Sequence, residues 1–68
     1  MNKTTINWTA DTVNMNIDGI KKQYARNPQT NEIYDYKSYQ DAVEFGSELI
    51  LIGKLMKKPD GKFKFIKA

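Results

Sequence analysis

Lysine is the residue type in this sequence that most clearly suggests a binding function. Residues 54–68 contain six lysines and one acid, Asp60, so this segment carries a net charge of +5. Lysine ammonium groups neutralise phosphates, and binding of this kind weakens as the salt concentration rises. A flexible lysine stem positions a nucleic-acid backbone without reading its bases. The segment therefore predicts sequence-independent nucleic-acid binding as one candidate function. The lysines expected on one face of a C-terminal hairpin are Lys54, Lys58, Lys62 and Lys64.

Tyrosine offers a second candidate surface. The four tyrosines, Tyr24, Tyr34, Tyr36 and Tyr39, supply more aromatic area than a thin core can easily cover. Tyrosine is common at protein interfaces because it adds a large rigid ring with a polar tip. The charges are also segregated, since residues 27–53 carry one lysine against five acids. An uneven charge distribution orients a charged partner. We therefore expect a protein partner, a host factor being one candidate; the alternative is that these rings cap a small core.

Catalytic chemistry has little support in the residue types present. The sequence contains no cysteine and no histidine, which removes the commonest general base and the commonest transition-metal ligand. Ser38 and Ser47 have no histidine to activate them. The carboxylates do not follow the spacing of a calcium loop, and no glycine-rich phosphate loop is present. We expect no enzymatic activity, no cofactor and no metal site.

Length and composition indicate one small folded domain over residues 1–68. Hydrophobic residues make up 40% and charged residues 28%, as in ordinary folded proteins, and the net charge is +3. The longest apolar run covers four residues, 49–52, against the ~20 that a membrane span needs. The first residues lack the unbroken apolar segment of a secretory signal. We expect no membrane association and an intracellular location.

Alternating apolar residues in the N-terminal half predict strands. Residues 4–18 read as a hairpin with its turn at Ala10-Asp11, because apolar residues alternate with polar ones on both sides. Asp18-Gly19 is a second turn signal, and residues 20–24 follow as a weaker strand. A further hairpin with a loop at 27–31 is predicted by Asn27 and Pro28, which favour turns.

One short helix is expected over residues 38–46. Ser38 is placed to cap its N-terminus, with Asp41 at the third helical position. Tyr39, Ala42 and Val43 form an apolar side, and Gly46 is suited to a left-handed C-terminal cap. A helix of about two turns is stable only when it packs on other elements. It must therefore dock on the sheet.

The C-terminal residues predict a hairpin with a defined register. Strands over 48–57 and 62–67 are joined by Pro59-Asp60-Gly61, which suits a type I turn followed by a glycine bulge. Counting back from this turn places Leu55 opposite Phe65 and Met56 opposite Lys64, with Lys57 opposite Phe63 and Lys54 opposite Ile66. Alternation then separates an apolar face from a lysine-rich face.

These elements predict an α+β fold with five or six antiparallel strands and one helix. A closed five-strand barrel of the OB type is the main alternative, although the connecting loops would be unusually short for it. An exposed edge strand makes a homodimer possible. The expected core consists of Ile6, Trp8, Val13, Met15, Ile17, Ile33, Val43, Leu49, Leu51, Leu55, Phe63 and Phe65.

One resemblance concerns the C-terminal two-thirds of the chain. The stretch 27–39, NPQTNEIYDYKSY, followed by IGKL at 52–55 and a KFI ending, resembles small accessory modules of large DNA viruses and phages. The resemblance implies a viral or phage origin, and with it the host cytoplasm as location. It implies no activity and assigns no residue a role.

Overall fold

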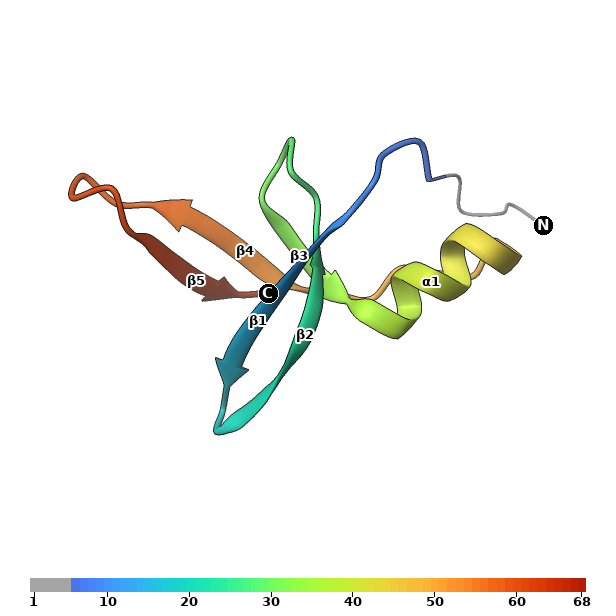
Figure 1. Cartoon of the computed structure of the whole chain (residues 1–68), viewed down its shortest axis with the longest axis horizontal. Helices are drawn as coiled ribbons and strands as arrows, with labels where there is room; N and C mark the ends of the chain where they lie inside the picture. Colours follow the sequence, from blue (N-terminus) through green and yellow to red (C-terminus); the bar gives the residue numbers. More distant parts are fainter. Residues whose placement is uncertain (1–5) are drawn as a thin grey trace.

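A computed structural model describes residues 6–68 as a five-stranded antiparallel sheet with one helix. The strands follow one another across the sheet in chain order: β1 (Asp11–Ile17), β2 (Ile20–Arg26), β3 (Glu32–Asp35), β4 (Leu51–Lys57) and β5 (Phe63–Lys67). Helix α1 (Tyr36–Phe45) connects β3 to β4 (Figure 1). The predicted α+β class is confirmed. The sheet is curled rather than closed, because β1 and β5 are its two edges.

The first hairpin is formed by β1 and β2, so the prediction of a hairpin over 4–18 is wrong. Asp18 and Gly19 form its turn with φ values of 54° and 82°. Two positive φ angles give a turn whose twist matches that of the flanking strands, and Asp-Gly tolerates them well. Residues 6–10 lie outside the strands, and residues 4 and 5 lie outside the described part. The strand predicted over 20–24 is confirmed and extends to Arg26.

The predicted loop at 27–31 is confirmed, and Asn27 organises it. The Asn27 side chain accepts a hydrogen bond from the backbone N–H of Gln29 at 2.9 Å. The backbone N–H of Asn31 donates to the Asn27 carbonyl at 2.7 Å, and Asn31 itself has a φ of 64°. This local network joins β2 to β3 and puts Ile33 opposite Arg26.

The helix begins two residues earlier than predicted, and its N-cap is Asp35 rather than Ser38. The Asp35 side chain accepts from the Ser38 backbone N–H at 3.0 Å. Ser38 is buried instead, where its hydroxyl donates to the Asp35 carbonyl and accepts from the Ile50 N–H. An ionised carboxylate is a strong cap because it favours the positive N-terminal end of the helix dipole. Gly46, with a φ of 72°, ends the helix as predicted.

The C-terminal hairpin has the predicted register in full. Leu55 pairs with Phe65, Met56 with Lys64, Lys57 with Phe63 and Lys54 with Ile66. Gly61 has a φ of 86°, and its N–H donates to the Lys58 carbonyl at 2.9 Å. The first strand starts at Leu51 rather than at residue 48, because residues 46–50 connect it to the end of α1.

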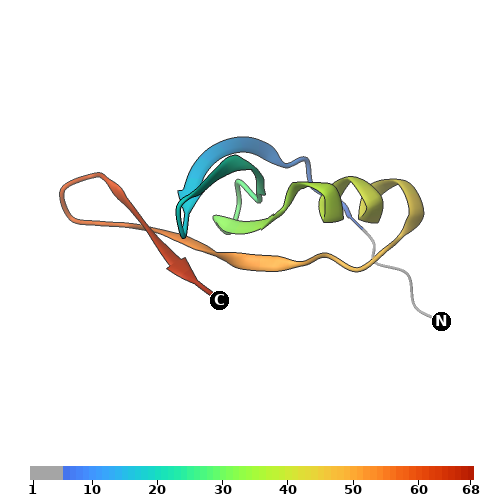
Figure 2. The same cartoon turned by 90° about the horizontal axis from the view of Figure 1, so that it is seen from below.

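The core is small and lies where the two hairpins cross. Figure 2 shows β1 and β2 arching over β4 and β5. Register places Val13, Tyr24 and Ile33 on the concave face of the curl, together with Leu55 and Phe65. An ion pair of 2.6 Å between Lys67 and Asp18 links the end of β5 to the β1–β2 turn. Within the described part of the chain, the buried apolar residues are Tyr24, Ala25, Ile33 and Ala42.

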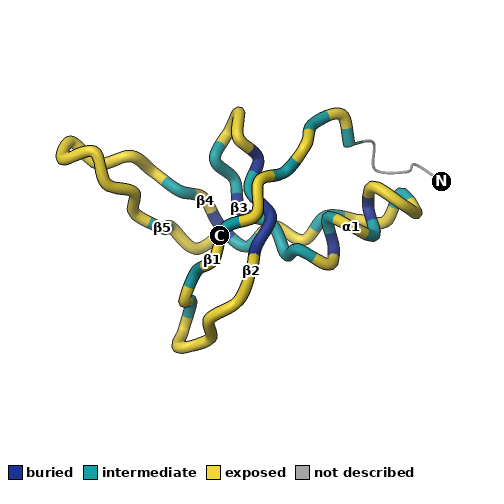
Figure 3. The backbone as a smooth tube through the Cα atoms, viewed as in Figure 1, coloured by how far each residue is buried: buried dark blue, intermediate teal, exposed yellow. Residues whose placement is uncertain are grey.

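The predicted core is wrong at three positions. Val43, Leu51 and Phe63 are exposed, whereas Ile33 is buried and the other predicted members are half-buried. Phe63 lies near the free end of the C-terminal hairpin, which projects beyond the crossing and is mostly exposed (Figure 3). The buried residues of α1 are Ser38 and Ala42, which lie one turn apart on the inward side of the helix, and Val43 lies outside this side and is exposed. The molecule is therefore elongated, with extents of 43 × 25 × 18 Å.

Candidate binding surfaces

The four tyrosines do not form one exposed surface. Tyr24 is only 4% exposed and belongs to the core. Tyr34 and Tyr39 both pack against Trp8, with ring centroids 5.7 and 5.2 Å from that of the indole. Tyr36, the first residue of α1, is half-buried. The rings thus serve mainly to cover the sheet, which is the alternative that the sequence left open.

Trp8 is placed by the Tyr39 hydroxyl. This hydroxyl accepts a hydrogen bond from the Ala10 backbone N–H at 3.1 Å and donates to the Trp8 carbonyl at 3.4 Å. The aromatic cluster therefore holds residues 8–10 against the helix and β3.

Tyr34, the other tyrosine beside Trp8, has a raised pKa. Burial, followed by the charge of Glu32, raises the pKa of Tyr34 above its ordinary value, so the Tyr34 phenol is neutral at physiological pH.

Removal of the Tyr39 hydroxyl gives a first test of the structure. Tyr39→Phe should lower the free energy of unfolding by about 1 kcal/mol, because the Ala10 N–H loses its partner while the ring stays in place. Urea unfolding followed by circular dichroism measures the change. Tyr36→Phe is the matched control, since the Tyr36 hydroxyl makes no hydrogen bond to residues 6–68. Equal losses in the two variants would contradict the assigned role of Tyr39.

The lysine-rich face of the C-terminal hairpin forms as predicted. All four lysines are exposed, and none makes an ion pair with another residue of the described chain. Met56 and Ile66, both exposed, lie on the same face between them. We call this surface the basic face; its residues are Lys54, Met56, Lys58, Lys62, Lys64 and Ile66.

A second exposed surface lies at the end of α1 and was not recognised in the sequence. Val43 and Phe45 are exposed on the last turn of the helix, and Glu44 lies between them. Glu48, in the connection to β4, is exposed as well. We call these four residues the acidic end. A run of acids with interspersed apolar residues around Gly46 was the only signal in the sequence, and helical spacing alone suggested that Val43 faces the core.

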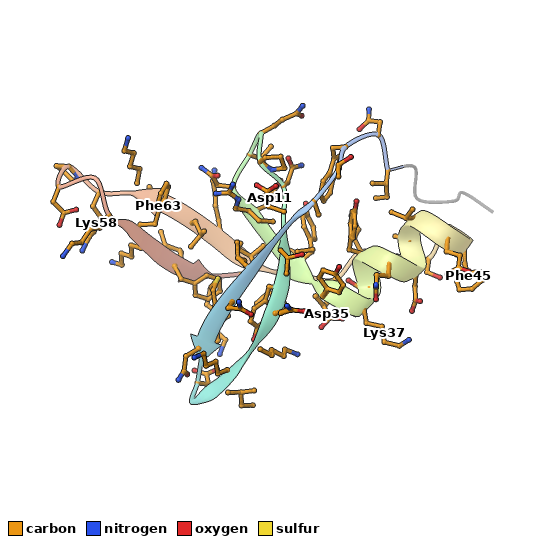
Figure 4. The ribbon with its side chains drawn as sticks, viewed as in Figure 1. Asp11, Asp35, Lys37, Phe45, Lys58 and Phe63 are labelled. Carbon is orange, nitrogen blue, oxygen red and sulfur yellow. The ribbon has the colours of Figure 1, made fainter. Side chains whose placement is uncertain are left out.

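Figure 4 shows where the two surfaces lie relative to each other. Lys58 marks the free end of the C-terminal hairpin, and Phe45 marks the end of α1 at the opposite end of the long axis. The basic face and the acidic end are therefore separated by most of the length of the molecule. Each combines exposed apolar side chains with charges of one sign.

A shallow hollow of about 190 Å³ lies between β3, β4 and the end of β5. Leu51, Gly53 and Ile66 contribute to its lining, and Glu32 and Lys54 lie at its sides. Pockets that bind small molecules usually exceed ~300 Å³ and enclose most of the ligand. The hollow is thus better described as a groove beside the basic face than as a small-molecule site.

Residues 6–68 contain no group of three His, Cys, Asp or Glu side chains arranged to hold a metal ion. Within the same residues, no helix has the length and apolar character needed to cross a membrane.

Comparisons with protein-family models, with curated proteins and with solved structures gave no match. The resemblance to viral and phage accessory modules therefore stays a prediction.

Proposed function

We propose that this chain is a non-enzymatic binding protein that contacts other protein molecules through the basic face and the acidic end. One observation carries the proposal. Among residues 6–68, four apolar residues are buried, whereas eight large apolar side chains are 40–65% exposed. Four of the eight belong to the two surfaces: Val43, Phe45, Met56 and Ile66.

This distribution is unusual for a chain that works alone. Soluble monomers rarely gather exposed apolar side chains into patches with a polar rim unless the patch binds something. A chain of 68 residues also has little stability to spare, so it gains much from covering such surface. The absence of histidine and cysteine supports a binding role over a catalytic one. A host protein remains a candidate partner on the strength of the viral resemblance.

Affinity capture tests the proposal. The wild-type protein, immobilised on beads, should enrich specific proteins from an extract of the cells in which it is expressed, or retain added copies of itself. The variant Phe45→Ser/Met56→Ser should lose most of this capture, because it removes an apolar side chain from each surface.

Ile20→Ser is the matched control for this capture. Ile20 is as exposed as Phe45 but lies at the β1–β2 turn, outside both surfaces. Its replacement should leave capture unchanged. If the wild type enriches nothing beyond the empty beads, or if the double variant captures as well as the wild type, the proposal is wrong.

A second candidate function, nucleic-acid binding, is favoured by the geometry of the basic face. Lys58 and Lys62 face each other beside the turn, where partners on neighbouring strands lie ~5 Å apart. Lys62 and Lys64 are i and i+2 neighbours, which lie ~6.5–7 Å apart along a strand, close to the spacing of phosphates. The four lysines are exposed and free of ion pairs within residues 6–68. Such a surface is suited to sequence-independent contacts with a phosphate backbone.

Charge reversal on this face gives a sharp prediction. If all four lysines contact phosphates, the logarithm of the affinity for short labelled oligonucleotides should fall with the logarithm of salt with a slope of about −3 to −4. Lys58→Glu/Lys62→Glu should weaken binding and flatten the slope by about half. Fluorescence anisotropy between about 20 and 300 mM salt measures both effects.

The control for this experiment has the same net charge as Lys58→Glu/Lys62→Glu. Lys21→Glu/Lys57→Glu reverses two exposed lysines that lie outside the basic face. It should retain most of the slope. No binding by the wild type at the lowest salt, or equal losses in the two double variants, would rule out the basic face as a specific nucleic-acid surface.

A further inference from the structure

We infer that the acidic end of one copy of this chain binds the basic face of a second copy. The inference rests on the proposed function and names the partner of its two surfaces. We assign a second copy of the chain as the partner because the two surfaces are complementary in charge and both carry exposed apolar side chains. They also lie too far apart to meet within one molecule.

The charges of the two surfaces are opposite and unsatisfied. Glu44 and Glu48 are exposed and form no ion pair within residues 6–68, as is true of the four lysines of the basic face. The last turn of α1 contains no basic residue, although the carbonyl end of a helix carries a partial negative charge that cations normally offset. Lysines from a second copy would supply the missing positive charge.

Each surface also contains exposed apolar side chains. Met56 and Ile66 lie among the lysines, and Phe45, which is 65% exposed, follows Glu44 on the last turn of α1. Protein interfaces usually combine apolar contacts with a charged rim. The opposite charges of the two surfaces would favour this pairing and oppose contact between two like surfaces.

The complementarity cannot be satisfied within one molecule. The hairpin that carries Lys58 and the helix that ends at Phe45 point in opposite directions along an axis of 43 Å (Figure 4). The sheet, with its cross-strand hydrogen bonds from β1 to β5, lies between them. Contact between unlike surfaces therefore joins separate copies, either as an antiparallel pair in which both contacts form or as a longer head-to-tail assembly.

Nucleic acid is the competing occupant of the basic face. It would engage the same lysines, and therefore would dissociate the copies rather than join them through the acidic end. The acidic end has no part in that alternative. A variant altered only at the acidic end therefore separates the two.

Sedimentation velocity on the purified full chain tests the inference with two charge-reversed variants. The wild type should show an average mass that rises with protein concentration at low salt and falls towards the monomer mass as salt rises. Lys58→Glu/Lys62→Glu and Glu44→Lys/Glu48→Lys should each weaken self-association by about tenfold or more, because attraction becomes repulsion at two positions. An equimolar mixture of the two variants should restore association, since each retains one wild-type surface and the two reversed surfaces also attract.

The controls separate a folding defect from a lost contact. Circular dichroism should show unchanged secondary structure in both variants, because all four positions are exposed. Lys21→Glu/Lys57→Glu, with the same net charge as the hairpin variant, should associate like the wild type.

Three results would overturn the inference. They are a wild type that stays monomeric at low salt and high concentration, a charge variant that associates like the wild type, and a mixture that associates no better than its components. The proposed function is tested separately by the capture experiment. If the wild type is monomeric but captures proteins that Phe45→Ser/Met56→Ser does not capture, the two surfaces bind a different protein.

Discussion

Ile33→Ala should lower the free energy of unfolding by about 3 kcal/mol, and in a chain this small that loss should leave much of the protein unfolded at room temperature. Ile33 is 0% exposed and lies in the central strand, opposite Arg26 on β2 and Gly53 on β4. Its truncation removes three carbons from the point where the two hairpins cross. Urea unfolding, followed by circular dichroism and by Trp8 fluorescence, measures the loss.

The control for this substitution uses the same pair of residue types at an exposed site. Ile50 is 56% exposed, so Ile50→Ala should change the free energy of unfolding by about 0.5 kcal/mol or less. Similar losses in the two variants would mean that the core does not lie beneath the curl of the sheet.

Gly53→Ala should destabilise the protein by about 2–3 kcal/mol. A Cβ atom at position 53 would lie against the Ile66 backbone carbonyl and only 2.6 Å from the Phe65 ring. The ring could rotate away, but the carbonyl belongs to β5 and cannot move without disturbing the pairing of β4 with β5. The added methyl group should therefore weaken the hairpin that carries the basic face.

Gly19→Ala distinguishes this clash from the general cost of replacing a glycine. A Cβ atom at Gly19 meets nothing within 4 Å, but the residue has a φ of 82°. The cost there should be about 1 kcal/mol, from backbone strain alone. Thermal unfolding of the two variants, followed by circular dichroism, should give a clearly lower midpoint for Gly53→Ala; the reverse order would contradict the steric argument.

Turns and their neighbouring strands were predictable wherever the residues at the turn themselves impose a geometry. Pro59-Asp60-Gly61 specifies a bulged turn, and counting from it gave the register of β4 and β5 without error. Gly46 ends the helix and Asn27 organises its loop for equally local reasons. The lysines of the basic face were consequently placed correctly, because alternation along a strand follows from the register.

Pairing between segments was less predictable. Ile6 and Trp8 alternate with polar residues as strand residues do, yet this segment lies beside the helix and β3 instead of pairing with β1. Both Asp18-Gly19 and Ala10-Asp11 were recognised in the sequence as possible turns. Asp-Gly forms the hairpin turn more readily because it accepts two positive φ angles, and this preference decides which strands pair. The N-cap was misplaced for a similar reason, since both Asp35 and Ser38 have capping side chains.

By itself, the sequence determined the class of fold, the C-terminal hairpin with its basic face, and the segregation of charge along the chain. Only the tertiary structure decided which apolar side chains are buried. Tyr24 and Tyr34 each lie between one polar and one apolar neighbour, but the curl of the sheet buries one and Trp8 covers the other. Phe63 is as apolar as Phe65, but it lies beyond the point where the hairpins cross and stays exposed. Burial depends on what lies across from a side chain, and that is set by the path of the whole chain rather than by any local pattern.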